Sequence, residues 1–267
     1  MSNSSQNQVD PSTFLDISRP NAARIFDYFL GGTVNFEADR IAAQELLHLI
    51  PGLPKWVRLR HAYVQTAVQT LAGEGFNQFL DLGTNIPTHD YIHKLVPDAR
   101  IVFSDINPVA VTYGQSLFID QENIAYIRGD ARDPEQLLAD PVIKKMFNPT
   151  EKIAIGLNSV LIFISVAQGQ HLARTLYEWA PAGSKLFLAF QTRHRDTETY
   201  KALQSVTEAA GMKLHLHLYD EYVTMLHPWQ LIFSQPIRQY LDVGDEYLPE
   251  SEQDDFGTEF YATMLSK

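Results

Sequence analysis

The chain has 267 residues, of which 45% are hydrophobic and 20% charged, a composition ordinary for a globular protein that buries its own core. Its formal net charge of −11 argues against general affinity for nucleic acid or anionic membranes, and the absence of cysteine excludes disulfides and thiolate metal sites. Residues 1–13 are polar and lack the apolar core of a signal peptide, and no stretch is apolar enough to span a membrane. We expect a cytoplasmic protein whose residues 1–17 are disordered.

Residues 18–75 show the 3.6-residue period of amphipathic helices. The apolar positions predict three helices, at residues 21–30, 36–50 and 55–76. Gly31 and Gly32 separate the first two helices, and a Pro-Gly-Leu-Pro sequence ends the second. We therefore predict a helical cap or lid at residues 18–75, followed by one core domain at residues 76–267.

From residue 77 onward, short apolar runs alternate with helical stretches. Five runs occur, at residues 78–83, 100–106, 124–130, 152–158 and 184–192, and all but the third are followed by a plausible helix. This alternation predicts parallel strands joined by right-handed crossovers. Residues 229–237 and 259–267 are expected to pair as an antiparallel edge. Residues 213–219 fit either a strand or an extended connection, and residues 242–257 an acidic surface loop.

Candidate ligand-binding residues stand at the ends of the first four predicted strands. They are Asp81, Gly83, Thr84 and Asn85, then Asp105, then Gly129, Asp130 and Ala131, and finally Asn158 and Ser159. An aspartate at one strand exit commonly caps a turn or helix. Three carboxylates at corresponding exits indicate more, because ligands of open parallel sheets bind at this edge and buried carboxylates need donors. The pattern predicts a ligand rich in hydroxyl and amino groups.

The first strand exit distinguishes between two adenosine cofactors. Asp105 lies 24 residues after Asp81, a spacing at which an acid can accept both hydroxyls of a ribose in NAD or S-adenosylmethionine. A dinucleotide loop needs G-x-G-x-x-G, but that frame reads Gly83, Asn85 and Thr88 here. Asp81 would repel a pyrophosphate and support an amino group or sulfonium. Asparagine tolerates the left-handed turn, so the loop favours S-adenosylmethionine.

Four stretches resemble the S-adenosylmethionine-dependent methyltransferase family that was once catalogued as a domain of unknown function and is abundant in actinobacteria. They are residues 23–40, 78–93, 99–111 and 129–138, and the similarity extends over roughly residues 18–266. The most specific part is D-Y-F-L-G-G…N-F…D-R, which ordinary methyltransferases lack. The family loop usually reads D-x-G-T-G-x-P-T, and this chain has Asn85 in place of that glycine.

The resemblance implies a set of cofactor contacts at the strand exits. The methionine end would lie against Asp81, Gly83 and Thr84, and Asn85 of the same loop would also contact the cofactor. Asp105 would hold the ribose hydroxyls, with Ile106 beside the adenine. Asp130 would accept from the adenine amino group, with Ala131 adjacent. Asn158 and Ser159 would border the sulfonium methyl.

The resemblance also implies that Tyr28, Gly32 and Asn35 fold over the cofactor as a lid. A structural account competes with this: the two glycines would end one helix and Asn35 would cap the next. The residues alone favour the structural account. The family pattern favours the lid, because simple capping explains the neighbouring Asp27, Tyr28, Asp39 and Arg40 poorly. Asp39 and Arg40 are also candidates for an ion pair.

The histidines give little support for metal or acid–base chemistry. His89 and His93 are spaced i, i+4 on a predicted helix, but no third ligand is near in sequence, so no metal is expected. His215 and His217 are interpreted as a solvated face. Tyr28 and His194 are the candidates for a general base, and the basic residues 193–195 could meet an acidic substrate. No nucleophile elbow or phosphate-binding P-loop is present.

The sequence thus predicts an α/β fold: a Rossmann-like methyltransferase core with a mostly parallel seven-stranded sheet, an antiparallel C-terminal edge strand and an N-terminal helical cap. The expected reaction is methyl transfer from S-adenosylmethionine to an unidentified small molecule, with S-adenosylhomocysteine as product. Two alternatives stay open, a non-catalytic protein that binds either compound and an NAD-dependent oxidoreductase. A nucleic-acid methyltransferase is disfavoured by the charge and by the absence of N-P-P-[YF] after the fourth strand. A homodimer is left open.

Overall fold

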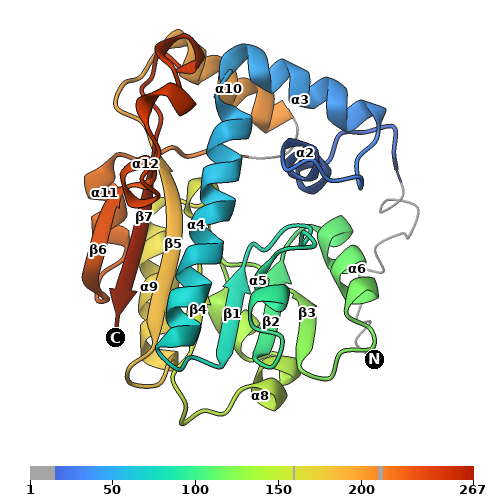
Figure 1. Ribbon diagram of the computed structural model, residues 1–267, viewed down its shortest axis with the longest axis vertical. Coiled ribbons are helices and arrows are strands. Elements are labelled where there is room, and N and C mark those ends of the chain that lie inside the picture. The colour runs from blue at the N-terminus through green and yellow to red at the C-terminus, as the bar shows by residue number, and fades with distance from the viewer. Residues whose placement is uncertain (1–15, 159, 210–212) are drawn as a thin grey trace, which may run out of the picture.

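The computed structural model describes residues 16–158, 160–209 and 213–267. A seven-stranded sheet forms its centre, in the order β3-β2-β1-β4-β5-β7-β6 (Figure 1). The strands are β1 (Gln78–Leu82), β2 (Arg100–Asp105), β3 (Ile124–Arg128), β4 (Ala154–Gly156), β5 (Lys185–Thr192), β6 (Gln230–Pro236) and β7 (Glu259–Ser266). Neighbours among β1 to β5 are parallel, and β7 runs antiparallel between β5 and β6. The predicted fold is confirmed.

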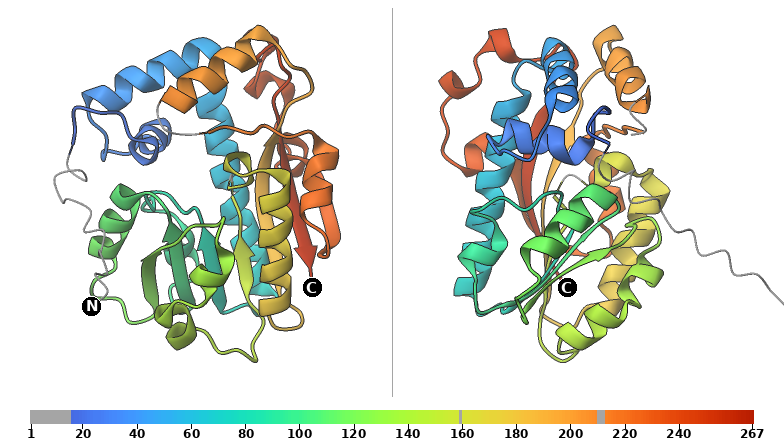
Figure 2. Two further views of the ribbon diagram at one scale, coloured as in Figure 1. Left: turned by 180° about the vertical axis from the view of Figure 1, so that it is seen from behind. Right: turned by 90° about the vertical axis from the view of Figure 1, so that its right-hand side faces the viewer.

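Two helical layers cover the sheet. The helices are α2 (Ala22–Phe29), α3 (Glu37–Leu49), α4 (Leu53–Gly73), α5 (Ile92–Leu95), α6 (Pro108–Leu117), α7 (Pro134–Leu138), α8 (Pro141–Met146), α9 (Val166–Trp179), α10 (Glu198–Ala209), α11 (Tyr219–Met225) and α12 (Ile237–Tyr240). α4 and α9 lie on opposite faces, as the right-hand view of Figure 2 shows. None of the helices in the described part of the chain combines the length and apolarity needed to cross a membrane.

The alternation of side chains along β1 assigns Asp81 to one face. Leu80 and Leu82 pack in the core with α9, whereas Phe79 packs in the core with α4. Successive strand residues point to opposite faces, so Asp81 lies on the α4 side with Phe79. All of β1 is buried, which explains why its sequence is apolar apart from Gln78 and Asp81.

The N-terminal helices have two different positions. α2 and α3 lie above the carboxyl ends of the strands, and we call this pair the cap (Figure 1). α4 instead runs down from the cap and packs on the sheet through Tyr63, whose hydroxyl donates to Thr263 O of β7 at 2.6 Å. The segment predicted as a cap, residues 18–75, therefore also supplies a helix of the sheet layer.

A buried ion pair holds the cap together. Arg24 Nε of α2 lies 2.7 Å from Asp39 Oδ2 of α3, and both side chains are almost fully buried. The Asp39 carboxylate also accepts from the backbone N–H groups of Asn21 and Phe36. The predicted pairing of Asp39 with Arg40 is wrong, because Asp39 points inward to Arg24 while Arg40 bonds to Asn35.

Three further expectations need correction. β3 is followed by the short helices α7 and α8, whose signals are an aspartate cap followed by proline at Asp133 and Asp140. His217 is buried rather than solvated, and its Nε2 lies 2.9 Å from Ile164 O. The acidic segment 242–257 contains two 3₁₀ turns, η2 (Asp245–Tyr247) and η3 (Glu250–Glu252), and buries Leu248 and Phe256. Residues 213–217 form an extended connection with one bridge to β5.

Candidate functional site

The loop after β1 turns through two left-handed residues. Gly83 has φ +68° and Asn85 has φ +66°, so asparagine makes the turn that the sequence predicted it could make. Asn85 stabilises this conformation through its side chain, whose Oδ1 accepts from Ile86 N at 2.9 Å. A side chain at position 83 would also meet Val160 Cγ2 at 2.5 Å. The loop therefore keeps its close approach to the neighbouring strand exit.

The backbone around the loop fixes Asp105. Its Oδ2 accepts from Asn85 N and its Oδ1 from Asn107 N, both at 2.8 Å. Burial raises the pKa of this carboxyl, and the backbone donors oppose the rise. Each oxygen retains a further lone pair. Asp105 is thus held in one orientation and can still accept hydrogen bonds from a ligand.

A cavity of about 350 Å³ opens at the carboxyl ends of β1 to β4, beneath α2. We call it the main cavity, and its volume lies within the range of small-molecule sites. Most of the predicted cofactor residues line it: Gly83, Asn85, Asp105, Ile106, Asp130, Ala131 and Asn158. Ala22, Ala23 and Phe26 of α2 form part of its wall. The sheet therefore brings together residues that are up to 75 positions apart between Gly83 and Asn158.

At one end of the main cavity, Asp130 is bound to Arg132. Arg132 Nη2 donates to Asp130 Oδ2 at 2.7 Å, and its Nε donates to both carboxylate oxygens. This pairing lowers the pKa of Asp130. Ile106 is 46% exposed beside it. The sequence did not identify Arg132 as a partner of this carboxylate.

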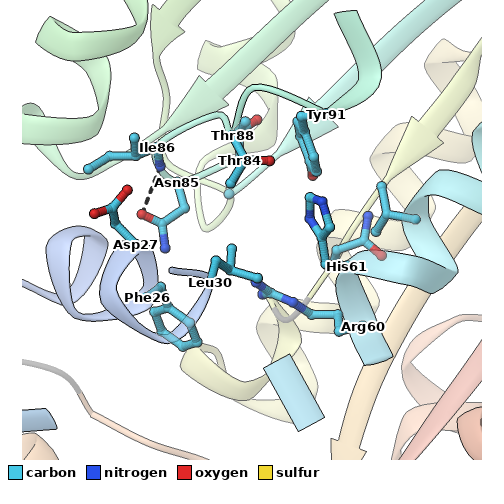
Figure 3. Close-up of a pocket in the computed structure, with 13 residues that line it drawn as sticks. Phe26, Asp27, Leu30, Arg60, His61, Thr84, Asn85, Ile86, Thr88 and Tyr91 are labelled. Atoms are coloured by element: carbon cyan, nitrogen blue, oxygen red, sulfur yellow. Dashed lines mark hydrogen bonds between the residues drawn. The ribbon is translucent and has the colours of Figure 1, made fainter. Parts of the chain in front are cut away.

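A narrow recess of about 20 Å³ adjoins the main cavity and shares Phe26, Arg60, Gly83, Asn85 and Asn158 with it. Its remaining lining residues are Asp27, Leu30, His61, Val64, Thr84, Ile86, Thr88 and Tyr91 (Figure 3). The predicted residue Thr84 thus lies in the recess rather than in the main cavity. The recess is enclosed by the β1 loop, by α4 and by the end of α2.

Asp81, also predicted as a cofactor residue, is buried on β1 and lines neither the recess nor the main cavity. Its Oδ2 accepts from the Tyr91 hydroxyl at 2.9 Å, but its Oδ1 has no hydrogen-bond partner among the described residues. Asn158 Nδ2 is likewise without a partner there. Burial raises the pKa of Asp81 to about 6, although Thr84, Tyr91 and Asn158 act to lower it. An ionised carboxylate in this position calls for a cationic donor.

Arg60 of α4 reaches into the same region. Its guanidinium lies over the Phe26 ring at 5.3 Å, and Figure 3 shows the side chain extending toward the end of α2. Next to it, His61 Nε2 lies 3.0 Å from Asp90 Oδ1, and burial lowers the pKa of this histidine. The His61 ring stacks on Tyr91 at 5.8 Å. Asp90 and His61 thus help to position the Tyr91 phenol that donates to Asp81.

Comparison with known proteins identifies the family of the chain. A family model described as S-adenosyl methyltransferase matches residues 8–234. The chain belongs to this S-adenosyl methyltransferase family. The match confirms the resemblance seen in the sequence. No curated protein matches the chain.

Solved structures share the methyltransferase fold. A putative methyltransferase from Thermobifida fusca is 29% identical, with 97% of this chain and 99% of that chain covered and a TM-score of 0.82. A DUF574 family protein from Streptomyces avermitilis is 24% identical, with 95% and 99% covered and a TM-score of 0.81. The geranyl diphosphate C-methyltransferase of Streptomyces coelicolor is only 9% identical, with 75% and 80% covered and a TM-score of 0.52. The last two likenesses show the fold alone.

The family signature in the cap mainly orders the cap itself. Asp27 Oδ2 accepts from Val34 N at 2.8 Å and from Asn35 Nδ2 at 2.9 Å, and Gly32 N donates to Asp27 O. Phe36, not Asn35, is the N-cap of α3. The residues of α2 that line the cavities are Ala22, Ala23, Phe26 and Asp27.

Several residues that the sequence placed at the site lie elsewhere. Tyr28, Gly32 and Asn35 line neither the main cavity nor the recess, and the Tyr28 hydroxyl accepts from Gln44. His194 is exposed, and it too lines neither. Ser159 falls outside the described residues.

The two histidines considered for metal binding differ in their exposure to solvent. His93 is buried with its ring 4.9 Å from that of Phe118, whereas His89 is exposed. Within residues 16–158, 160–209 and 213–267, no group of three potential ligands is close enough to hold a metal ion.

Sequence analysis in turn missed Arg60, His61 and Tyr91. Arg60 had a readable signal, because it interrupts an apolar stripe of α4 between Trp56 and Val64, both 2% exposed. Arg60 is partly buried there and lines both the recess and the main cavity.

Proposed function

We propose that the protein binds S-adenosylmethionine in the main cavity and transfers its methyl group to a small-molecule acceptor. The observation that carries the proposal is the main cavity at the carboxyl ends of β1 to β4, where backbone N–H groups hold Asp105 in an orientation that leaves lone pairs for ribose hydroxyls. A ligand that offers a ribose and a cationic amino group would satisfy the carboxylates of both Asp105 and Asp81. A dinucleotide would also offer ribose hydroxyls to Asp105, but it would bring a pyrophosphate toward Asp81, which repels it.

The lining residues suit the adenosine part of the cofactor. Asp105 would accept from the ribose hydroxyls, while Ile106 and Ala131 would pack against the adenine. Asp130 is engaged by Arg132, but a carboxylate has lone pairs beyond those that one guanidinium uses. It would therefore still accept from the adenine amino group. Asn158 would lie beside the sulfonium, with its free Nδ2 available to the methionine end.

The bound cofactor supplies an activated methyl group with a good leaving group. The task of the chain is to align the acceptor and to exclude water. α2 serves this purpose, since Ala22, Ala23 and Phe26 cover the main cavity with apolar atoms. The net charge of −11 disfavours a nucleic-acid acceptor, which supports a small molecule.

Calorimetric titration of the full chain with S-adenosylmethionine, S-adenosylhomocysteine and NAD tests the proposal. We expect micromolar binding of the first two and none of NAD. Binding of NAD alone would contradict the proposal. Tight binding of S-adenosylhomocysteine with almost no affinity for the methyl donor would indicate a non-catalytic binding protein.

Asp105→Ala is expected to weaken binding of both sulfur compounds by more than about 1 kcal/mol, because the ribose hydroxyls would lose their acceptor. The exposed Asp120 provides a matched control, and Asp120→Ala should leave the affinity unchanged. If Asp105→Ala binds as tightly as the unaltered chain, the placement of the ribose is wrong.

A further inference from the structure

One wall of the main cavity is not used by the proposed cofactor contacts. Phe163 and Ile164 follow β4 and line this cavity, and Lys213 lines it from the extended connection after α10. We call these three residues the β4-side wall. Phe163 is 36% exposed, so its ring is accessible to a ligand. The wall therefore offers an apolar surface and a cation to a molecule beside it.

The strand order places the β4-side wall away from the adenosine contacts. Asp105 ends β2 and Asp130 follows β3, whereas Asn158 follows β4, which lies on the other side of β1. The cofactor would therefore extend along this edge of the sheet, with its adenine toward β3 and its methyl group toward β4. In a direct displacement the acceptor approaches the methyl carbon from the side opposite the sulfur. An acceptor that approaches from beyond β4 would meet the β4-side wall.

Hydrogen bonds hold the connection that carries Lys213 against the residues after β4. His215 N donates to Ile162 O at 2.6 Å, and His217 Nε2 lies 2.9 Å from Ile164 O. These bonds fix the backbone next to Lys213. The position of this cation beside the main cavity is thus a consequence of the fold.

Lys213 has no protein partner for its charge. Within the described part of the chain, its ammonium makes no ion pair or hydrogen bond, although three other lysines pair with glutamates: Lys55, Lys185 and Lys201. Three more lysines likewise make no ion pair there, but they line none of the described cavities: Lys94, Lys144 and Lys145. Lys213 is therefore the unpaired lysine whose position allows it to bind a ligand of the main cavity.

We propose that the β4-side wall binds the methyl acceptor and that this acceptor is a small acid with an apolar body. The body lies on Phe163, and the acidic group pairs with Lys213. The inference rests on the proposed function and adds the chemical class of the acceptor. An amine is disfavoured because both the sulfonium and Lys213 would repel it. The carboxylates of Asp105 and Asp130 do not oppose an acid, since the adenosine covers them.

Calorimetry on the full chain saturated with S-adenosylhomocysteine tests this inference. Three probes share one apolar body and differ in their end group: 3-phenylpropanoate, 3-phenylpropan-1-ol and 3-phenylpropylamine. We expect the carboxylate to bind at least about fivefold more tightly than the alcohol or the amine, because a charged acceptor pairs with Lys213. Equal affinity for all three probes, or tighter binding of the amine, would overturn the role of Lys213.

Two variants separate the contributions of the cation and the ring. Lys213→Met keeps an apolar stem and removes the charge, so it should bring the carboxylate to within about twofold of the alcohol. Phe163→Ala should weaken all three probes alike, because they share the phenyl group that contacts the ring. Loss of the alcohol along with the carboxylate in Lys213→Met would contradict a charge-specific role.

Lys145→Met is the matched control, because Lys145 is exposed on α8 and should leave every affinity unchanged. Binding of S-adenosylhomocysteine by each variant shows that it is folded. If the unaltered chain binds S-adenosylhomocysteine but none of the probes, the proposed cofactor site stands and the acceptor class is wrong. If it does not bind S-adenosylhomocysteine, the proposed function fails and this inference fails with it.

Discussion

Replacing Asp81 by asparagine should stabilise the protein while it removes cofactor binding. Burial raises the pKa of this carboxyl to about 6 from an ordinary value of 3.8, which corresponds to roughly 3 kcal/mol of destabilisation when the group is ionised. Asp81→Asn keeps the shape and an acceptor for the Tyr91 hydroxyl but carries no charge. We expect it to raise the free energy of unfolding at pH 8 by about 1–3 kcal/mol, or roughly 2–4 °C in Tm per kcal/mol.

The gain in the free energy of unfolding from Asp81→Asn should depend on pH. The folded carboxyl keeps its proton to a higher pH than the unfolded one, so the unaltered chain loses stability as pH rises through about 6 and regains it as pH falls toward 4. The advantage of Asp81→Asn should therefore be full at pH 8 and shrink below pH 6. Urea unfolding from pH 5 to 8 measures this.

Asp130→Asn is the control, because pairing with Arg132 lowers the pKa of Asp130 and the variant should show no such gain. The reasoning would be refuted if Asp81→Asn were no more stable than the unaltered chain at pH 8, or if its advantage did not change with pH.

Two further variants test the loop and the cap. Asn85→Ala should lower stability by about 1 kcal/mol because alanine fits φ +66° poorly, whereas Asn85→Gly should stay within about 0.5 kcal/mol. Urea unfolding compares the two, and equal stability would show that the turn is not strained. Asp39→Asn leaves the buried Arg24 guanidinium without its counter-charge and should cost about 3 kcal/mol or more. Thermal unfolding measures this, and an unchanged Tm would mean that the pair contributes nothing.

The strands of the sheet could be predicted from the sequence because each one depends on a short local pattern of residues. The near-continuous apolar runs of β1 to β5 reflect burial on both faces, and each run predicts a strand without reference to the rest of the chain. The conformation of Asn85 was predictable for the same reason, since it depends on the backbone preference of one residue. The short helices α7 and α8 were missed because five or six residues carry too little periodicity to distinguish them from a loop.

The role of the family pattern in the cap, residues 27–40, could not be predicted from neighbouring residues in the sequence. Asp27 and Asp39 could belong to either a lid or a capping network as long as their partners were unknown. The fold supplies those partners, Asn35 for Asp27 and Arg24 for Asp39, and shows that Phe26 rather than Tyr28 reaches the cavities. His217 is a similar case, since its alternating pattern is typical of a solvated face and the packing against Ile164 buries it.

The sequence by itself determined the order of the strands and of the longer helices, the turn at Asn85 and the carboxylates at three strand exits. Only the tertiary structure decided that Asp81 is buried on the side of β1 that α4 covers and that Arg60 of α4 lines the recess and the main cavity. The physical reason is that a charge is satisfied by groups close in space. β1, β4 and α4 meet only when the sheet and its covering helix are assembled.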